Sequence, residues 1–426
     1  MKKYQLVKNE KYSSFLIYLL IINSIYFGRD TLVSTAWLNF FGCQLLILLF
    51  VILYTILFIV NNKSNILNII FDVRFIFLLI TSLLFLLIMI LKRDFTLMYL
   101  SCIIAIYFSV FLSYILNIKQ FLKIFTNVIL IFTAFSLIVG YLLRPLIFSN
   151  VESLMITENS VGLQFINCIG TFLVNDPGYL RNFGIFREPG IFQFFLTVAL
   201  IFEIFLIKRN NVYKRRIFIF ILLIGSLTTF STTGMIQLIL IFFATLIENI
   251  RKICFNKIKV LLGFIFFFII FGILFYLVKN NNNLYWTIWQ MFSKFSNLNE
   301  SLVSRFSSIK MNISFFLKNP ILGNDISLVL YSINNTNSSL LLFACYGLLI
   351  GTIFNYCWLF ICNGLYLKTN NKVTKILIIL VFLVSINTQN LTTNFYFYSI
   401  PIISLFEQKI MIIFNNIFNS KKENNK

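Results

Sequence analysis

The feature that most constrains this chain is the recurrence of apolar runs of about 18 or more residues along its length. Each run is long enough to cross a bilayer as a helix, and 59% of the residues are hydrophobic. Inside a bilayer every backbone N–H and C=O must be paired within the protein, which leaves helices or a closed barrel. The runs are continuous and do not alternate, so we expect an all-α, polytopic integral membrane helix bundle. It would form one domain over residues 1–426.

We predict about twelve spans, which would leave both termini on the same side of the membrane. The predicted spans are residues 12–28, 36–60, 74–91, 96–116, 122–143, 190–207, 217–232, 235–248, 259–278, 339–364, 375–393 and 396–413. Two long segments, 144–189 and 279–338, lie between spans on one side. The first contains an apolar stretch at 161–174 that is too short to span, and we predict an interfacial or re-entrant helix there.

The basic residues are distributed as topology determinants. The chain has 35 Lys and Arg against 14 Asp and Glu, a formal net charge of +21. These residues lie in short loops and form no separate basic domain, which argues against nucleic acid as a partner. With the N-terminus inside, about two thirds of the Lys and Arg residues fall on the cytoplasmic side. We therefore expect cytoplasmic termini, with segments 144–189 and 279–338 outside.

Histidine is absent, and the seven cysteines are scattered singly without a pair such as CxxC. The absence of histidine excludes histidine general bases and histidine metal sites. We expect no metal and no cofactor, and we interpret the cysteines as small buried apolar residues.

Ionisable residues cluster in RNFGIFREPGIFQFFL, residues 181–196, where a polar segment becomes an apolar helix. Charge is costly at a membrane interface, so Arg181, Arg187 and Glu188 are candidates for a functional site. A guanidinium can bind phosphate through two N–H donors, and a carboxylate can accept a proton. Pro189 suits the first turn of a helix, and the glycines allow positive φ or close backbone approach. The alternative is a structural Arg–Glu pair that only positions the bend.

Two further segments carry polar residues between apolar runs. LTTFSTTG, residues 227–234, could line a polar cavity, but a hairpin turn whose hydroxyls cap helix ends is the preferred interpretation. Arg305, by default a surface charge, precedes apolar residues at helical spacing (306, 309, 313, 316 and 317). This spacing predicts an amphipathic helix that lies against the bundle. Asn319-Pro320, within KNPILGND, would end that helix.

Glu203 is the conspicuous acid inside a predicted span. It lies about one turn before Lys208 and Arg209, so it can pair with them or extend toward the interface. A proton-relay role is the alternative.

Taken together, these segments resemble the O-antigen polymerase and ligase superfamily of bacterial inner-membrane glycan-assembly enzymes. RNFGIFREPGIFQFFL is similar to the family's arginine–glycine–phenylalanine–glutamate–proline signature before a membrane helix. LTTFSTTG resembles its serine/threonine–glycine hairpin. Arg305 followed by NPILGN resembles the arginine and "NP-aliphatic-aliphatic-G" pattern of its large outer loop. The ligase branch has a His-Asn pair before the next helix, where this chain has Thr336-Asn337. The resemblance therefore favours the polymerase branch.

The resemblance implies glycosyl transfer on the outer face of the bacterial inner membrane. The growing glycan, linked to undecaprenyl diphosphate, would be the donor, and a hydroxyl of an incoming lipid-linked unit would attack its anomeric carbon. By the same resemblance Arg181, Arg187, Arg305 and Asn337 would bind substrate, the arginines stabilising the leaving diphosphate. Glu188 would be the catalytic base or an orienting carboxylate. Membrane lipid and a chain-length regulator protein are the other implied partners.

Three other functions are compatible with parts of the sequence. An O-antigen ligase is the nearest alternative. A flippase or other secondary transporter would equally have twelve spans and cytoplasmic termini, although the sequence shows no internal repeat and few charges within the spans. A non-enzymatic membrane scaffold would leave the Arg-Glu pair unexplained.

Overall fold

The computed structural model describes residues 10–28, 31, 34, 42–49, 51–52, 72–150, 156–158, 163–168, 170–253, 300–331, 336–361 and 371–407. This part of the chain is mostly helical. Its helices are α1 (Glu10–Tyr26), α4 (Val73–Lys92), α5 (Leu97–Ile115), α6 (Ile118–Leu137), α7 (Arg144–Phe148), α8 (Pro189–Ile201), α9 (Val212–Thr228), α10 (Thr232–Ile253), α13 (Glu300–Lys318), α14 (Ile326–Tyr331), α15 (Ser338–Leu359), α17 (Lys372–Ile386) and α18 (Phe395–Glu407). The helices α6 and α8 continue into π-helical turns, Ile138–Leu142 and Phe202–Leu206.

Five of the described helical segments are long and apolar enough to cross a membrane. They are Val73–Lys92, Leu97–Ile115, Ile118–Leu142, Pro189–Leu206 and Ser338–Leu359. Shorter apolar helices lie at Phe15–Tyr26, Thr232–Glu248 and Phe395–Phe406. The predicted ninth span, 259–278, lies outside the described residues, and the second, 36–60, is described only in part. The count of about twelve spans stays a prediction.

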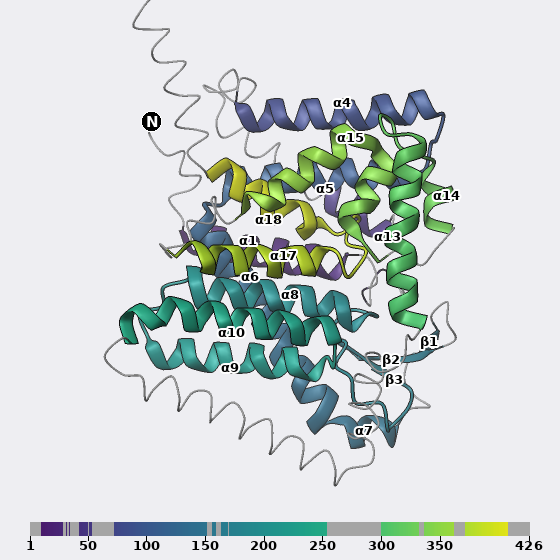
Figure 1. Cartoon of the computed structure of the whole chain (residues 1–426). Coiled ribbons are helices and arrows are strands. Elements are labelled where there is room, and N and C mark those ends of the chain that lie inside the picture. The colour runs from purple at the N-terminus through teal and green to yellow at the C-terminus, as the bar shows by residue number, and fades with distance from the viewer. Residues whose placement is uncertain are drawn as a thin grey trace, which may run out of the picture.

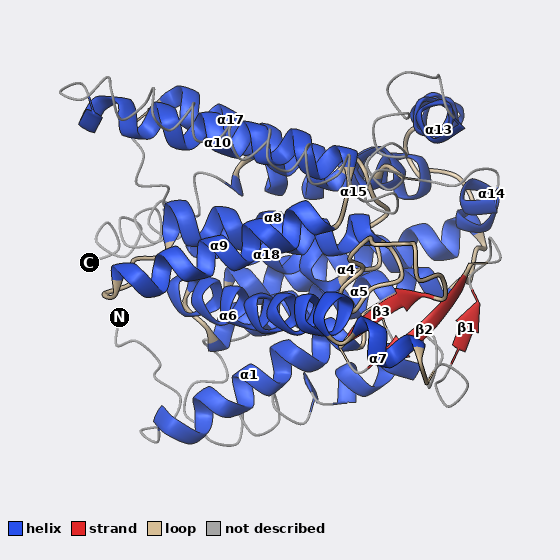
Figure 2. Ribbon diagram, turned by 90° about the horizontal axis from the view of Figure 1, so that it is seen from below, coloured by secondary structure: helices blue, strands red, loops and turns tan. Residues whose placement is uncertain are grey.

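Most helices pack side by side. The elements that do not follow this arrangement, α13, α14 and a small sheet, lie at one end of the bundle. Figure 1 shows α4, α8, α9, α10 and α17 running in similar directions, whereas α13 runs crosswise to them. Figure 2 gives the perpendicular view, in which α13 is seen end-on near α14 and a small sheet. We call this the sheet end of the bundle.

The sheet corrects the prediction made for residues 161–174. The described residues of this stretch form strands in place of an interfacial or re-entrant helix, and the fold is therefore not purely all-α. Strands β1 (Ile156–Glu158), β2 (Gln164–Cys168) and β3 (Thr171–Val174) form an antiparallel sheet in the order β1-β2-β3. Periodicity cannot distinguish a helix from strands in so short an apolar run. Tertiary packing decides, because Phe165 contacts the rings of Phe172 and Phe183 at 5.9 and 5.3 Å between ring centroids.

An aromatic core connects the helices to the start of α8. The rings of Phe125 on α6 and Phe195 on α8 stack with centroids 6.0 Å apart, and Tyr396 on α18 contacts both. Phe195 also stacks on Phe186 at 4.9 Å. Phe186 belongs to the 181–196 motif, so the motif is attached directly to the core of the bundle.

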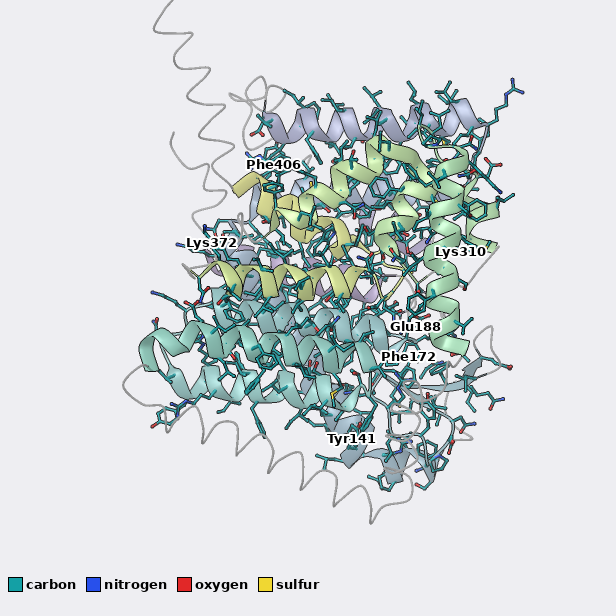
Figure 3. The ribbon with its side chains drawn as sticks, in the orientation of Figure 1. Tyr141, Phe172, Glu188, Lys310, Lys372 and Phe406 are labelled. Carbon is teal, nitrogen blue, oxygen red and sulfur yellow. The ribbon has the colours of Figure 1, made fainter. Side chains whose placement is uncertain are left out.

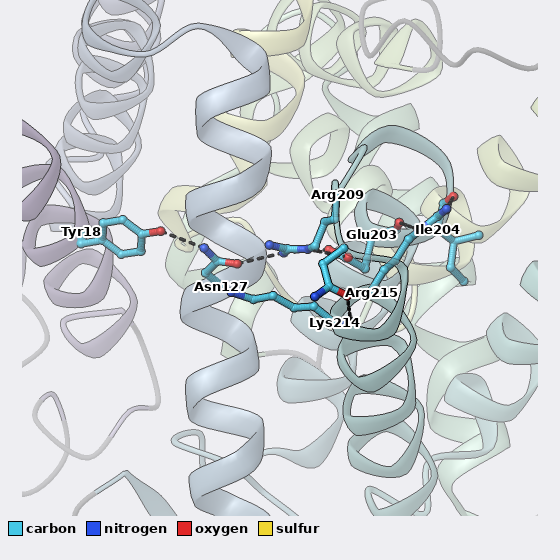
Figure 4. Close-up of polar contacts among 8 residues, drawn as sticks. Tyr18, Asn127, Glu203, Ile204, Arg209, Lys214 and Arg215 are labelled. Atoms are coloured by element: carbon cyan, nitrogen blue, oxygen red, sulfur yellow. Dashed lines mark hydrogen bonds and ion pairs between the residues drawn. The ribbon is translucent and has the colours of Figure 1, made fainter. Parts of the chain in front are cut away.

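The end opposite the sheet contains a buried ion pair, which confirms the expectation that Glu203 pairs with a nearby cation. Arg209 donates from Nε and Nη2 to the two carboxylate oxygens of Glu203, at 2.6 and 2.9 Å. The same Nη2 donates to Asn127 on α6, whose amide donates to the Tyr18 hydroxyl on α1 (Figure 4). Arg215 donates to the Glu203 backbone carbonyl. Glu203 is fully buried, and this network joins α1, α6, α8 and α9.

Candidate functional site

The loops that the sequence predicts on the outer side of the membrane lie together at the sheet end. Lys92 at the end of α4 donates to the carbonyl of Asn324, 232 residues later, at 2.5 Å. The Asn182 amide N–H donates to the carbonyl of Thr228 at the end of α9. Ser338 at the start of α15 donates from its hydroxyl to the Gln389 carbonyl. Gly190 of the 181–196 motif also lies against the Gln389 side chain, and Thr336 is hydrogen-bonded to α13, so the three motif segments lie at the same end of the molecule (Figure 1).

Residues 181–190, which we call the elbow, are fixed from two sides. The amide N–H of Phe172 on β3 donates to the Gly184 carbonyl at 2.8 Å, so the elbow extends the edge of the sheet. On the other side Phe186 forms an isolated antiparallel bridge with Thr31. Gly184 has φ of +56°, and a Cβ there would lie 2.7 Å from the Phe192 ring. The expected need for glycine is confirmed at this position, because other residues rarely adopt positive φ.

The approach to the elbow is held by two residues of the preceding segment. Arg144 donates from Nη2 to the carbonyls of Asp176, Pro177 and Tyr179 at 2.8–3.2 Å. Burial lowers the pKa of this guanidinium below its usual value. The Tyr141 hydroxyl donates to the Leu180 carbonyl at 2.7 Å. Together they fix the backbone immediately before Arg181.

Arg181, predicted to bind substrate, has a structural partner. Its Nε donates to the Thr229 carbonyl at 3.1 Å, just beyond the last residue of α9. A cation near the C-terminal carbonyls of a helix is favourable because the helix dipole is negative there. Arg181 therefore connects the elbow to α9, and a substrate-binding role for it stays a prediction.

Arg187 and Glu188 lie at the beginning of α8. Glu188 occupies the N-cap position with extended backbone angles, but its side chain does not cap the helix. The carboxylate side chain is exposed, and Arg187 is half-buried. Pro189 is the first helical residue, as the sequence predicts. Gly190 passes so close to the Gln389 side chain that a Cβ would overlap it, which confirms close backbone approach.

A buried layer of amide and hydroxyl side chains lies directly beneath the elbow. None of the sequence motifs predicted this layer. The Gln193 amide on α8 donates to Ser226 on α9 at 2.6 Å and accepts from the Thr229 hydroxyl at 2.9 Å. Gln237 on α10 accepts from the Thr197 hydroxyl at 2.7 Å. All five side chains are at least 97% buried. The available signal was a glutamine inside each of two apolar runs, which is costly without partners.

The 227–234 segment is the hairpin turn that the sequence predicts. Phe230 adopts φ of +45° between α9 and α10, and Ser231 accepts from the Gly234 amide N–H at 3.3 Å. Thr229 also donates into the amide layer. The segment thus caps a helix and contributes to a polar interior.

Arg305 and Asn337 lie on neighbouring elements. The Thr336 amide N–H donates to the Ser308 hydroxyl of α13, three residues after Arg305, at 3.4 Å. Arg305 is half-buried, and this burial lowers the pKa of its guanidinium. Asn337 is buried and caps α15 by accepting from the Leu340 amide N–H at 2.9 Å. This cap is a structural role, and substrate binding by Asn337 stays a prediction.

The prediction for α13 is confirmed at the C-terminal end of the helix, but the helix begins before Arg305 and most of its predicted apolar face points outward. The helix covers Glu300–Lys318 and is followed by Asn319-Pro320. Its buried side chains are Ser308, Asn312 and Phe315, whereas most of the predicted apolar stripe is exposed. The sequence marks an apolar face without showing what that face contacts. In the structure the Phe316 ring contacts the Phe343 ring of α15 at 5.4 Å between centroids, whereas Phe306, Ile313 and Leu317 are exposed.

NPILGN has a structural explanation in a break of α15. Gly347 interrupts the helix with φ 74° and ψ −171°. The loop fills the break, because Asn324 donates its amide N–H to the Ala344 carbonyl at 2.8 Å and Leu348 donates to the Pro320 carbonyl at 2.8 Å. Non-helical backbone is tolerated at such depth only where protein groups satisfy its hydrogen bonds. A hollow of about 480 Å³ lies beside this loop and not at the elbow.

At the elbow, the arrangement combines an exposed carboxylate, a half-buried guanidinium and the positive end of α8. Such an end attracts anions through its dipole and its unpaired N–H groups. Figure 3 shows Glu188, Phe172 of the sheet and Lys310 of α13 at this end. Among the described residues, no group of three or more Cys, Asp or Glu side chains is arranged to hold a metal. No protein-family model, curated protein or solved structure matches the chain.

Proposed function

We propose that this protein is a membrane glycosyltransferase, an O-antigen or capsule repeat-unit polymerase. It joins oligosaccharide units carried on undecaprenyl diphosphate at the outer face of the bacterial inner membrane. The observation that carries the proposal is the elbow. Its backbone is fixed by β3, by Thr31 and by the last carbonyl of α9, yet Glu188 is exposed.

The chemistry of the proposed reaction requires what the elbow offers. The leaving group is a diphosphate, so negative charge develops on it as the glycosidic bond breaks. Arg187, Arg305 and the N-terminus of α8 supply positive potential at fixed positions, which stabilises that charge without reorganisation. Glu188 can accept the proton of the attacking hydroxyl.

The buried layer beneath the elbow supports this assignment. Catalytic groups need a rigid foundation, because small displacements weaken their contribution to the transition state. Gln193 lies one turn into α8 and is hydrogen-bonded to residues of α8 and α9. A layer of this kind fixes the rotation of α8 and hence the direction of Glu188.

The test is reconstitution of the purified protein in liposomes with a polyprenyl-diphosphate-linked oligosaccharide. Products are resolved on a gel and weighed by mass spectrometry. A ladder with one repeat unit per step is expected from the wild type. Arg187→Ala, Glu188→Gln and Arg305→Ala should each lower the rate by about 100-fold or more. Arg93→Asn is the matched control, because Arg93 is exposed, lies in a different turn, and has a left-handed φ of 55° that Asn tolerates.

Other products would identify another function. Transfer of a finished glycan only to a second lipid acceptor, without a ladder, means a ligase. Movement of the lipid-linked oligosaccharide across the bilayer without a covalent change means a transporter. Equal loss of activity in Arg93→Asn and Arg187→Ala would remove the elbow from the site.

A further inference from the structure

The crosswise helix α13 has an outward surface unlike that of a water-exposed helix. Val303, Phe306, Ile313 and Leu317 form a stripe at intervals of three, seven and four residues, the spacing of one helix face. Their exposed fractions are 52%, 66%, 43% and 69%. A helix in water would turn such a stripe toward the protein and its polar residues outward.

The face of α13 that meets the protein is mixed. Ser308 and Asn312 are 0% and 1% exposed, and Ser308 accepts from the Thr336 amide N–H. On the same face Phe315 is buried, and the Phe316 ring contacts the Phe343 ring of α15. The exposed apolar stripe is thus additional to a face that already packs on the protein, and a large exposed apolar patch is expected where the surroundings are hydrocarbon.

A second exposed sector of α13 is polar. Ser314 and Lys318 are exposed and lie about 100° around the helix from Ile313 and Leu317, respectively. Phe306, Ile313 and Leu317 therefore form the apolar side of the outward surface, and Val303 and Lys310 lie at its border with the polar side. Helices that lie in a membrane interface have this division, with the apolar side in the acyl region and the polar side in water.

A spanning helix with an exposed apolar surface lies near α13. Lys92 at the end of α4 donates to the Asn324 carbonyl, which places the loop after α13 against α4. Only 22% of the spanning window of α4 is buried, so this helix is the least buried of the five. Leu91 on α4 and Ile321 in the loop are both exposed, at 59% and 70%. Exposed apolar side chains therefore occur on α4, in the loop and on α13 at the same end of the protein.

We propose that α13 lies in the plane of the membrane, with Val303, Phe306, Ile313 and Leu317 inserted among the lipids of the leaflet at the sheet end. Lys310 is exposed and falls within the stripe, where its long side chain can reach the lipid phosphates. A second copy packed on this stripe would bury the Lys310 charge, and no acid is among the described side chains of α13 to pair with it. The proposal concerns the surface of the protein and does not depend on the reaction at the elbow.

The experiment uses a genetically encoded benzophenone amino acid in the full-length protein. It replaces Phe306 or Ile313 in the stripe, or Ser314 as the control on the same helix. Each variant is reconstituted without substrate in nanodiscs of phosphatidylcholine and phosphatidylglycerol, illuminated, and analysed by intact-protein mass spectrometry. The exposure of these positions means that the larger side chain needs no space in the core. Leu317 replaces either stripe position if a variant is not monodisperse.

The expected result is a lipid adduct at positions 306 and 313 with a yield severalfold higher than at 314. Equal yields at 313 and 314 would overturn the proposal, because the helix would then have no lipid side. A crosslinked dimer in place of the lipid adduct would overturn it in favour of a second copy. Neither outcome bears on glycosyl transfer, which is measured separately with substrate.

Discussion

Replacing Gly347 with alanine should destabilise the protein more than most single substitutions. With φ 74° and ψ −171°, the residue occupies a region that only glycine adopts readily. A strained backbone of this kind costs about 1–3 kcal/mol. The new Cβ would also overlap the Ile321 carbonyl, so the loop must move away from α15. The two backbone hydrogen bonds between the loop and the break, worth about 1 kcal/mol each, would be lost. The expected loss of unfolding free energy is therefore about 3–5 kcal/mol.

The measurement is the apparent melting temperature of the detergent-solubilised protein, taken from the monodisperse fraction that remains after heating. Gly42→Ala is the control, since a Cβ at Gly42 meets no atom of the described residues within 4 Å. The control should change the unfolding free energy by no more than about 0.5 kcal/mol, whereas Gly347→Ala should lower the melting temperature by roughly 5 °C or more. If the two variants melt at the same temperature, the break in α15 does not depend on glycine and the reasoning is wrong.

Three further predictions follow from the buried polar groups. Glu203→Gln should destabilise the protein by about 3–5 kcal/mol, because it leaves the buried Arg209 charge uncompensated, and adding Arg209→Met should recover part of that loss in the same melting assay. Gln193→Leu removes the centre of the amide layer and should cost about 2–4 kcal/mol, because the hydroxyl of Ser226 loses its amide donor and those of Thr197 and Thr229 each lose one partner; a melting temperature equal to wild type would contradict this. Asn337→Ala should cost about 1 kcal/mol through the lost cap, and Asn337→Ser, which can still cap, should restore stability. Restored glycosyl transfer in Asn337→Ser would assign this residue to the fold, whereas stability without activity would support substrate binding.

Parts of the site could be predicted because they rest on local rules. Gly184 with its positive φ, Pro189 in the first turn of α8 and the hairpin around Phe230 all follow from the preferences of single residues. The pairing of Glu203 with Arg209 follows from their separation of six residues and from the cost of a buried charge. These features need no knowledge of the rest of the chain.

Other parts depended on residues far away in the sequence. Residues 164–168 and 171–174 form strands because β2 and β3 pair with each other and the Phe165 ring packs on Phe183. Asn324 has its role because Gly347 breaks a helix some twenty residues later. Gln193 became part of a polar layer only when α9 and α10 packed beside α8.

By itself, the sequence determined that this chain forms apolar helices, where most of them begin and end, and where the ionisable residues concentrate. Hydropathy and caps are properties of neighbouring residues, so they act before any tertiary contact forms. Which face of α13 meets the protein depends on tertiary packing. Burial of an apolar stripe lowers the free energy equally whether the stripe packs on the helix bundle or on lipid. That choice depends on whether Ser308 finds a partner in the loop before α15 and Phe316 a ring on α15, and no local pattern contains this information.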